Sequence, residues 1–224
     1  MNTFIPDVIV EVTTACNRAC VGCYAPNVIS KEGAIALYEK QPELFIKIGS
    51  INNAFNSIGG YSEVIAIRGG EPSLHPKLPI LLRIASTKGR KVFLETHGRW
   101  LLPESINEYK ELIKYIRADH IIVKISYDKM HGLSSDDLHR MTDFLEGNGI
   151  DYRIAITEFT LVDHFLTRSL CLWVPDEKII IQQKANRQEE LVKPSIGTIN
   201  VSGEVQRTLT HKFDLKEPSG VILI

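Results

Sequence analysis

Short runs of β-branched residues recur along most of the chain, and stretches with apolar residues at helical spacing separate them. Two of these stretches, Pro103–Arg117 and Ser134–Gly149, are predicted helices. Alternation of strands with helices predicts βα units on a parallel sheet, joined by right-handed crossovers. The fold class is therefore α/β. The predicted strands are Val8–Val12, Val64–Ile67, Lys91–Leu94, His120–Ser126, Tyr152–Thr157 and Lys178–Gln182.

The length of the chain limits how many units the sheet can hold. Six βα units occupy residues 8–192 of the 224 residues. Because a complete eightfold barrel takes about 250 residues, we predict a partial (βα)6 TIM-like barrel. After Pro194 the pattern changes to that of a terminal hairpin within residues 195–213, turning at Ser202 and Gly203. We find no linker-like stretch and expect one domain over residues 1–224.

Charge and hydropathy indicate which partners and which cellular location to expect. The formal net charge of −1 gives no basic footprint for nucleic acid, so a nucleic-acid partner is not favoured. Residues 1–6 lack a signal-peptide pattern, and the apolar runs are too short to span a bilayer, so we expect no membrane partner. We therefore predict a cytoplasmic protein with reduced thiols.

Three of the four cysteines lie within eight residues, directly after the first predicted strand: Cys16, Cys20 and Cys23. A cubane iron–sulfur cluster normally takes four thiolates, so three would leave one iron open to a small chelating molecule. Cys171 is distant in sequence and lies in an apolar segment. Two alternatives stay open at this point: a zinc site completed by a histidine from elsewhere, or three unrelated buried thiols.

This spacing resembles the CxxxCxxC signature of the radical S-adenosylmethionine (radical SAM) superfamily, which lies at the same place after the first strand. The resemblance extends over roughly residues 8–182. It implies a [4Fe–4S] cluster on Cys16, Cys20 and Cys23, whose open iron binds S-adenosylmethionine and cleaves it to a 5′-deoxyadenosyl radical. Many members carry a bulky residue just before the third cysteine. Here that residue is Gly22, so Tyr24 is expected to contact the adenine instead.

A second motif, Gly69-Gly70-Glu71-Pro72, follows the second predicted strand. Two glycines at a strand end allow a close approach that side chains would block. The motif resembles the family's GGEP, which implies that Glu71 binds the amino group of S-adenosylmethionine. The alternative is a tight βα turn with a capping glutamate.

Weaker matches follow the third and fourth strands. Thr96-His97-Gly98 resembles the family's Thr-Asn-Gly, which implies that Thr96 and His97 contact the cofactor. Strand four ends in Lys124-Ile125-Ser126-Tyr127-Asp128, which resembles the family's Ser-x-Asp. The resemblance implies that Ser126 bonds the ribose hydroxyls and Asp128 faces the substrate, with Lys124 a partner for the methionine carboxylate. Ordinary surface or strand-end polarity is the alternative for Lys124, Ser126 and Asp128, and a structural role is the alternative for His97.

The opening of the chain looks most like the subgroup that modifies peptides and related products. No cysteine follows Cys171, so we expect a minimal member without a C-terminal auxiliary-cluster extension. The predicted partners are a peptide or small-metabolite substrate and an electron donor such as flavodoxin or ferredoxin. Two alternatives remain: an activase of glycyl-radical enzymes, compatible with Lys129-Met130-His131, and a non-enzymatic iron–sulfur or zinc module.

Overall fold

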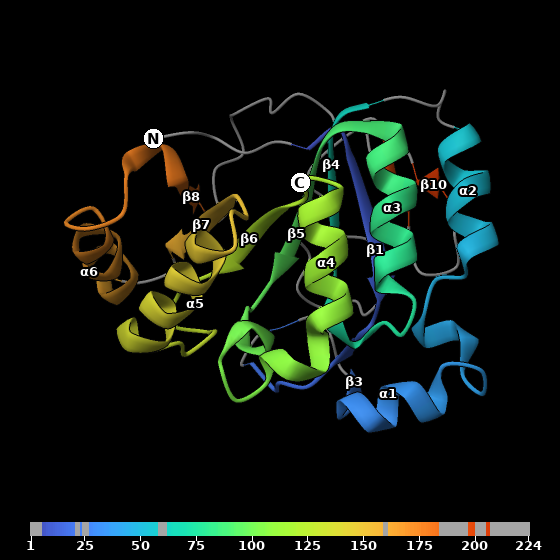
Figure 1. Ribbon diagram of the computed structural model, residues 1–224, viewed down its shortest axis with the longest axis horizontal. Helices are drawn as coiled ribbons and strands as arrows, with labels where there is room; N and C mark the ends of the chain where they lie inside the picture. Colours follow the sequence, from blue (N-terminus) through green and yellow to red (C-terminus); the bar gives the residue numbers. More distant parts are fainter. Residues whose placement is uncertain are drawn as a thin grey trace.

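Six parallel strands, in the predicted positions, form the centre of the molecule (Figure 1). The computed structural model describes residues 6–20, 23, 27–57, 62–158, 161–183, 197–199 and 205–206. The strands are β1 (Val8–Thr13), β4 (Ser62–Gly69), β5 (Gly89–Thr96), β6 (Ile122–Ser126), β7 (Tyr152–Glu158) and β8 (Ile179–Gln183). They are adjacent in this order, which confirms the predicted α/β fold of parallel βα units.

The C-terminal hairpin extends the sheet at the edge next to β1. Strand β9 (Gly197–Ile199) pairs with β1 in parallel, and β10 (Val205–Gln206) pairs with β9 in antiparallel fashion. The sheet order is β10-β9-β1-β4-β5-β6-β7-β8, and within the described residues no pairing joins β8 to the far edge. The hairpin itself is thus confirmed, while the predicted turn at Ser202 and Gly203 lies outside the described residues.

Helices connect the strands and cover one side of the sheet in Figure 1, with α3 and α4 side by side over its centre. The α-helices are α1 (Lys31–Leu37), α2 (Ile48–Ser57), α3 (Leu78–Lys88), α4 (Lys110–Ala118), α5 (Ser135–Gly147) and α6 (Leu161–Leu170). The 3₁₀ turns are η1 (Pro42–Leu44), η2 (Pro72–Leu74), η3 (Arg99–Leu101), η4 (Ile106–Tyr109) and η5 (Asp176–Lys178).

Three predicted boundaries shift for local reasons. The helix predicted from Pro103 begins only at Lys110, because the Leu102 carbonyl closes tight turns with the N–H groups of residues 105 and 106. Ser134 caps α5 by accepting the N–H of Asp137, so the helix begins one residue after the start of the predicted range. Strand β6 starts after His120, whose φ of 52° is left-handed and unsuited to a strand.

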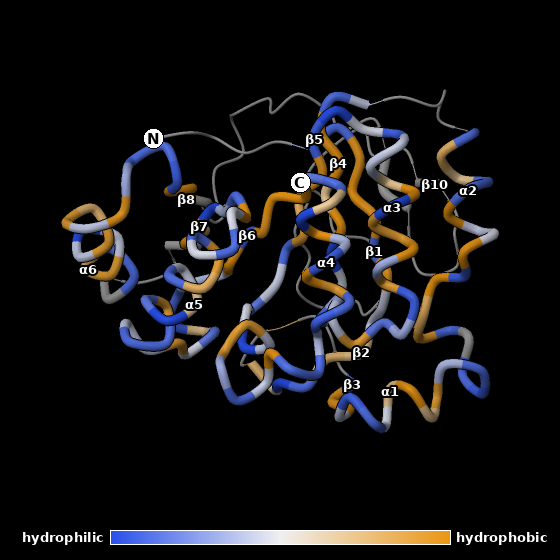
Figure 2. Tube along the Cα trace, viewed as in Figure 1, coloured by the Kyte–Doolittle hydropathy of each residue, from blue (hydrophilic) through white to orange (hydrophobic). Residues whose placement is uncertain are grey.

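The two faces of the sheet differ in what they bury. Alternate residues of β1, Val8, Val10 and Val12, belong to the main apolar core together with the inner faces of the helices. Side chains alternate along a strand, so Ile9 and Glu11 point to the opposite face. In Figure 2 the central strands are largely hydrophobic, whereas the outer turns of the helices are mixed or hydrophilic. Burying each such Val or Ile contributes roughly 1.5–3 kcal/mol.

A smaller element builds the end of the molecule where the strands finish. Two short strands, β2 (Ala15–Cys16) and β3 (Asn27–Val28), pair in parallel beyond β1. They lie with α1 in the lower part of Figure 2, past the carboxyl ends of the main strands. A second apolar cluster, which includes Phe45 and Leu74, packs beneath them.

His75 is expected to make the free energy of unfolding depend on pH. Its Nε2 bonds the Ile46 carbonyl at 2.9 Å and its Nδ1 accepts the Lys77 N–H, so the ring is neutral. Burial lowers the pKa of His75 to about 4. An unfolded histidine binds its proton near pH 6.5, so unfolding takes up a proton between these values. We therefore expect the free energy of unfolding to lose roughly 3 kcal/mol as the pH falls from 7 to 4.

Urea titrations at several pH values measure this loss. His75→Gln removes the titrating group and is expected to flatten the pH dependence between pH 7 and 4. His120→Asn, at an exposed position whose left-handed φ asparagine tolerates, serves as the control and should keep the wild-type slope. Equal slopes in the two variants would contradict the assignment to His75.

Candidate active site at the carboxyl ends of the strands

The three clustered cysteines lie directly beyond β1. Cys16 ends β2 and is buried, Cys20 is half-buried and Cys23 is exposed. The Cys23 N–H donates to the Cys20 carbonyl at 3.1 Å, which holds these two cysteines close to each other. All four cysteines are free thiols, but Cys171 is exposed beyond the end of α6 and does not belong to the core. Tyr24 and Gly22 lie outside the described residues.

The charges of Glu71 and of the other two thiols affect the pKa of Cys16. Burial raises the pKa of Cys16 to about 11, the Arg18 N–H lowers it, and the charges of Glu71, Cys23 and Cys20 raise it further. Within the described residues, no three His, Cys, Asp or Glu side chains gather around a single metal ion. A [4Fe–4S] cube binds each thiolate at a separate corner and requires no such convergence, so the thiol set and its spacing fit that group.

Gly69 and Gly70 hold the backbone of the cysteine segment. The Gly70 N–H donates to the Thr13 carbonyl at 2.7 Å, and the Glu71 N–H donates to the Ala15 carbonyl at 2.8 Å. A Cβ on either glycine would lie 2.3 Å from one of these carbonyl oxygens. The predicted close approach is therefore present, and the group approached is the backbone that leads into Cys16. Neither glycine needs a left-handed φ.

Glu71 is wholly buried and bonded to protein donors. Its Oε1 accepts the Ser73 N–H at 3.0 Å and the Thr96 hydroxyl at 2.8 Å. Its Oε2 lies 2.9 Å from the same hydroxyl and accepts the His97 N–H at 3.1 Å. Pro72, also buried, begins η2 directly after it. These three donors, from Ser73, Thr96 and His97, occupy most of the roughly four acceptor sites of the carboxylate, and they join the end of β4 to the end of β5.

His97 continues the network into the cysteine segment. Its Nδ1 accepts the Arg99 N–H at 3.1 Å, so Nε2 carries the proton and donates to the Asn17 Oδ1 at 2.8 Å. Burial lowers the pKa of His97, although Glu71, with its Oε2 3.3 Å from Nε2, acts in the opposite direction. Asn17 was not singled out from the sequence; its place directly after Cys16 was the available signal.

Thr96 connects Glu71 to the residues that follow β5. Its hydroxyl accepts the N–H of Gly98 at 3.0 Å and the Nε1–H of Trp100 at 2.9 Å while it donates to Glu71. The structure thus brings Glu71, Thr96 and His97 together in one buried hydrogen-bonded unit beside the cysteines. Such fully satisfied buried networks hold a single conformation.

The three residues predicted at the end of strand four do not form one site in the structure. Lys124 is buried and donates to the Glu95 Oε1 at 2.9 Å. Burial would raise the pKa of Glu95, but Lys124 and then Arg68 lower it. Asp128 is buried and accepts from the N–H and the Nδ1 of His131, the latter at 2.7 Å. Ser126 is half-buried at the end of β6.

Lys124 belongs to a row of charges across four neighbouring strands. In register, Glu11 of β1 faces Arg68 of β4, and Glu95 of β5 faces Lys124 of β6. Glu11 Oε1 lies 3.8 Å from Arg68 Nε, too far for a hydrogen bond. The alternating signs balance, which limits the cost of burying them. This row was not predicted, because its members are far apart in sequence.

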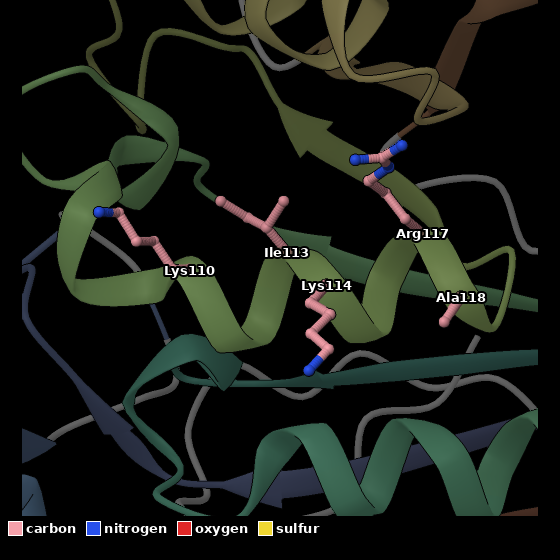
Figure 3. A pocket seen from close by; sticks show the side chains of 5 residues that line it. All are labelled: Lys110, Ile113, Lys114, Arg117 and Ala118. Atoms are coloured by element: carbon pink, nitrogen blue, oxygen red, sulfur yellow. The ribbon is translucent and has the colours of Figure 1, made fainter.

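One surface hollow lies elsewhere, on the outer face of α4 (Figure 3). It is lined mainly by Lys110, Ile113, Lys114 and Arg117, none of which belongs to the strand-end network. Among the described helices, none combines the length and apolar character that a bilayer-spanning helix needs.

Comparisons with known proteins agree with this geometry. The sequence model of the Radical SAM superfamily matches residues 10–125. Fe-coproporphyrin III synthase of Methanosarcina barkeri is 30% identical over 130 residues, which are 57% of this chain and 30% of that protein.

Solved structures share the fold. A structure of anSMEcpe with bound AdoMet and Kp18Cys peptide has a TM-score of 0.51 at 15% identity, covering 82% of this chain and 54% of that one. A histidine-tagged form of anSMEcpe with bound AdoMet has a TM-score of 0.51 at 18% identity, covering 84% of this chain and 52% of that one. The chain thus spans about half or less of the length of these relatives.

Proposed function

The chain belongs to the radical SAM superfamily, whose enzymes use a [4Fe–4S] cluster and S-adenosylmethionine, and on this premise we propose that Cys16, Cys20 and Cys23 hold the cluster. The observation that carries the proposal is their common segment, anchored by Gly70 and Glu71 at the carboxyl end of β1. When bound, the reduced cluster and S-adenosylmethionine supply a 5′-deoxyadenosyl radical for hydrogen abstraction. The protein contributes orientation and exclusion of water.

The residues of the chain divide this work among them. Glu71, Thr96 and His97 fix the ends of β4 and β5 against the cysteine segment, so that the ligands keep one arrangement. Ser126 and Asp128 lie at or beyond the carboxyl end of β6, where we place contacts to ribose and substrate. Lys124 binds the Glu95 side chain. A contact from Lys124 to the carboxylate of S-adenosylmethionine is then secondary to this ion pair.

We further propose a peptide or small-metabolite substrate. The support is indirect: anSMEcpe is solved with a bound peptide, and the relative from Methanosarcina barkeri acts in the synthesis of a tetrapyrrole. Residues 8–192 and the hairpin would form one domain, reduced by a flavodoxin or ferredoxin. The activase alternative and the cytoplasmic location stay predictions from the sequence.

Anaerobic reconstitution tests the reaction. The chain is loaded with iron and sulfide, reduced with dithionite and given S-adenosylmethionine, and 5′-deoxyadenosine is measured by chromatography. We expect its formation to require the reductant and to persist in Cys171→Ala. An intact cluster that yields no 5′-deoxyadenosine, with or without added candidate substrates, would contradict the proposed activity.

Glu71→Gln distinguishes two roles for Glu71: holding the strand ends through its hydrogen bonds, and binding the amino group of S-adenosylmethionine. In the cluster-free protein we expect the free energy of unfolding to fall by about 1–3 kcal/mol, because an amide nitrogen would face buried N–H donors. Urea unfolding measures this, with the exposed Glu63→Gln as the control. Unchanged stability together with weaker S-adenosylmethionine binding would instead assign Glu71 to the ammonium group alone.

A further inference from the structure

We propose that Arg18 and Arg99 form a site for a carboxylate of the substrate, next to the cysteine segment. Arg18 lies between Cys16 and Cys20, and Arg99 begins η3 after β5. The inference rests on the proposed function in one respect: the carboxylate belongs to the molecule presented to that centre.

The two guanidinium groups meet at one glycine. Arg99 Nη2 donates to the Gly132 carbonyl at 2.9 Å. Arg18 Nη2 lies 3.5 Å from the point where a Cβ on Gly132 would be. Gly132 is in the loop after β6 and has a φ of 53°, so both cations are brought to the same left-handed turn. Both guanidinium groups are therefore neighbours of the same residue in the loop after β6.

Neither cation has an acidic partner within the described part of the chain. The Nε atoms of Arg18 and Arg99 are both buried and lack a hydrogen-bond acceptor. The nearby acids are occupied: Asp128 accepts from His131, and Glu71 accepts from Ser73, Thr96 and His97. Buried donors without acceptors are rare in folded proteins, and the planar fork of a guanidinium group matches the geometry of a carboxylate.

The location favours the substrate over S-adenosylmethionine as the source of the carboxylate. S-adenosylmethionine carries its amino group and carboxylate on one carbon, so both must lie together. Glu71, the residue that the family motif assigns to the amino group, lies at the Nε2 of His97. The backbone N–H of Arg99 donates to the opposite ring nitrogen, Nδ1, and the Arg99 guanidinium group bonds the Gly132 carbonyl.

A matched pair of probes tests the charge requirement. N-acetylglycine carries a carboxylate, and N-acetylglycinamide is its neutral counterpart. By isothermal titration calorimetry or saturation-transfer NMR on the full chain, we expect saturable binding of the acid, at least tenfold weaker binding of the amide, and weakening by salt. Equal binding of the two probes, or no binding of the acid, would overturn the proposal.

Variants assign the binding to these residues. We expect Arg18→Gln and Arg99→Gln each to weaken N-acetylglycine binding at least tenfold, and Arg99→Lys to restore part of it. Arg90→Gln is the matched control, since Arg90 is an exposed arginine paired with Glu63. If a glutamine variant does not fold, Arg99→Lys and the comparison of the two probes still test whether these arginines bind the carboxylate. Unchanged binding in folded variants would overturn the assignment.

A competition experiment identifies the source of the carboxylate. With the reconstituted protein saturated by S-adenosylmethionine, a substrate site is expected to keep its affinity for N-acetylglycine. Displacement would assign the arginines to the cofactor's own carboxylate and overturn the proposal. Probe binding needs no catalysis, so binding without 5′-deoxyadenosine formation would count against the proposed function alone, and the reverse result against this inference alone.

Discussion

Single replacement of Cys16, Cys20 or Cys23 by alanine is expected to abolish the [4Fe–4S] cluster, and Cys171→Ala is expected to leave it intact. Three thiolates are the fewest that hold a cubane with one open iron, so no spare ligand compensates for a loss. Cys171 is exposed beyond α6, on a part of the chain that contributes no residue to the strand-end network. Iron and sulfide content, together with visible absorbance after anaerobic reconstitution, measure the result.

The expected wild-type value is about four irons per chain, falling to near background in each of the three variants. Formation of 5′-deoxyadenosine should be lost with the iron. Loss of the cluster in Cys171→Ala would contradict the three-ligand assignment. One tightly bound zinc per chain, with no iron taken up on reconstitution, would instead support the zinc alternative.

The strands were predictable because their signal is local. Each β-branched run carries its own propensity, and parallel sheets bury both faces of a strand, so the six runs were recognisable one by one. The pairing of β9 with β1 was not, since about 190 residues separate Val8 from Gly197 and no local pattern tells which edge a terminal strand joins.

The candidate site shows the same division. The positions of Glu71, Thr96 and His97 followed from motifs at the ends of adjacent strands, but their mutual bonds did not. The sequence favoured a ligand contact for each and left a capping role open for Glu71, and the Glu71 carboxylate accepts donors from Ser73, Thr96 and His97. Spacing in the sequence locates a side chain at a strand end; it does not specify the partner, because partners come from other strands.

Lys124 illustrates a signal that was present and not used. Acidic and basic residues alternate at matching positions of successive strands, and Glu95 faces Lys124 in register. In a parallel sheet such registered positions lie on the same face, so opposite charges there predict an ion pair before they predict a ligand contact. The register itself, however, becomes known only once the strands are aligned.

Gly70→Ala is expected to remove most of the cluster without touching a ligand. The new Cβ would lie 2.3 Å from the Ala15 carbonyl oxygen and 2.7 Å from its carbon, and these are backbone atoms that cannot rotate away. Relief requires separating the two segments, which breaks the hydrogen bonds from Gly70 to Thr13 and from Glu71 to Ala15. Overpacking and the loss of these two buried hydrogen bonds together cost about 4 kcal/mol.

Iron content after reconstitution and urea unfolding of the cluster-free protein measure both consequences of Gly70→Ala. The control is Gly147→Ala at the end of α5, where nothing lies within 4 Å of the new Cβ. There alanine favours the helix by up to about 1 kcal/mol, so stability should hold or rise and iron should bind normally. If Gly70→Ala bound iron as well as Gly147→Ala does, the cysteine segment would not depend on this contact. The second glycine of the motif would then serve a bound ligand rather than the backbone of Ala15.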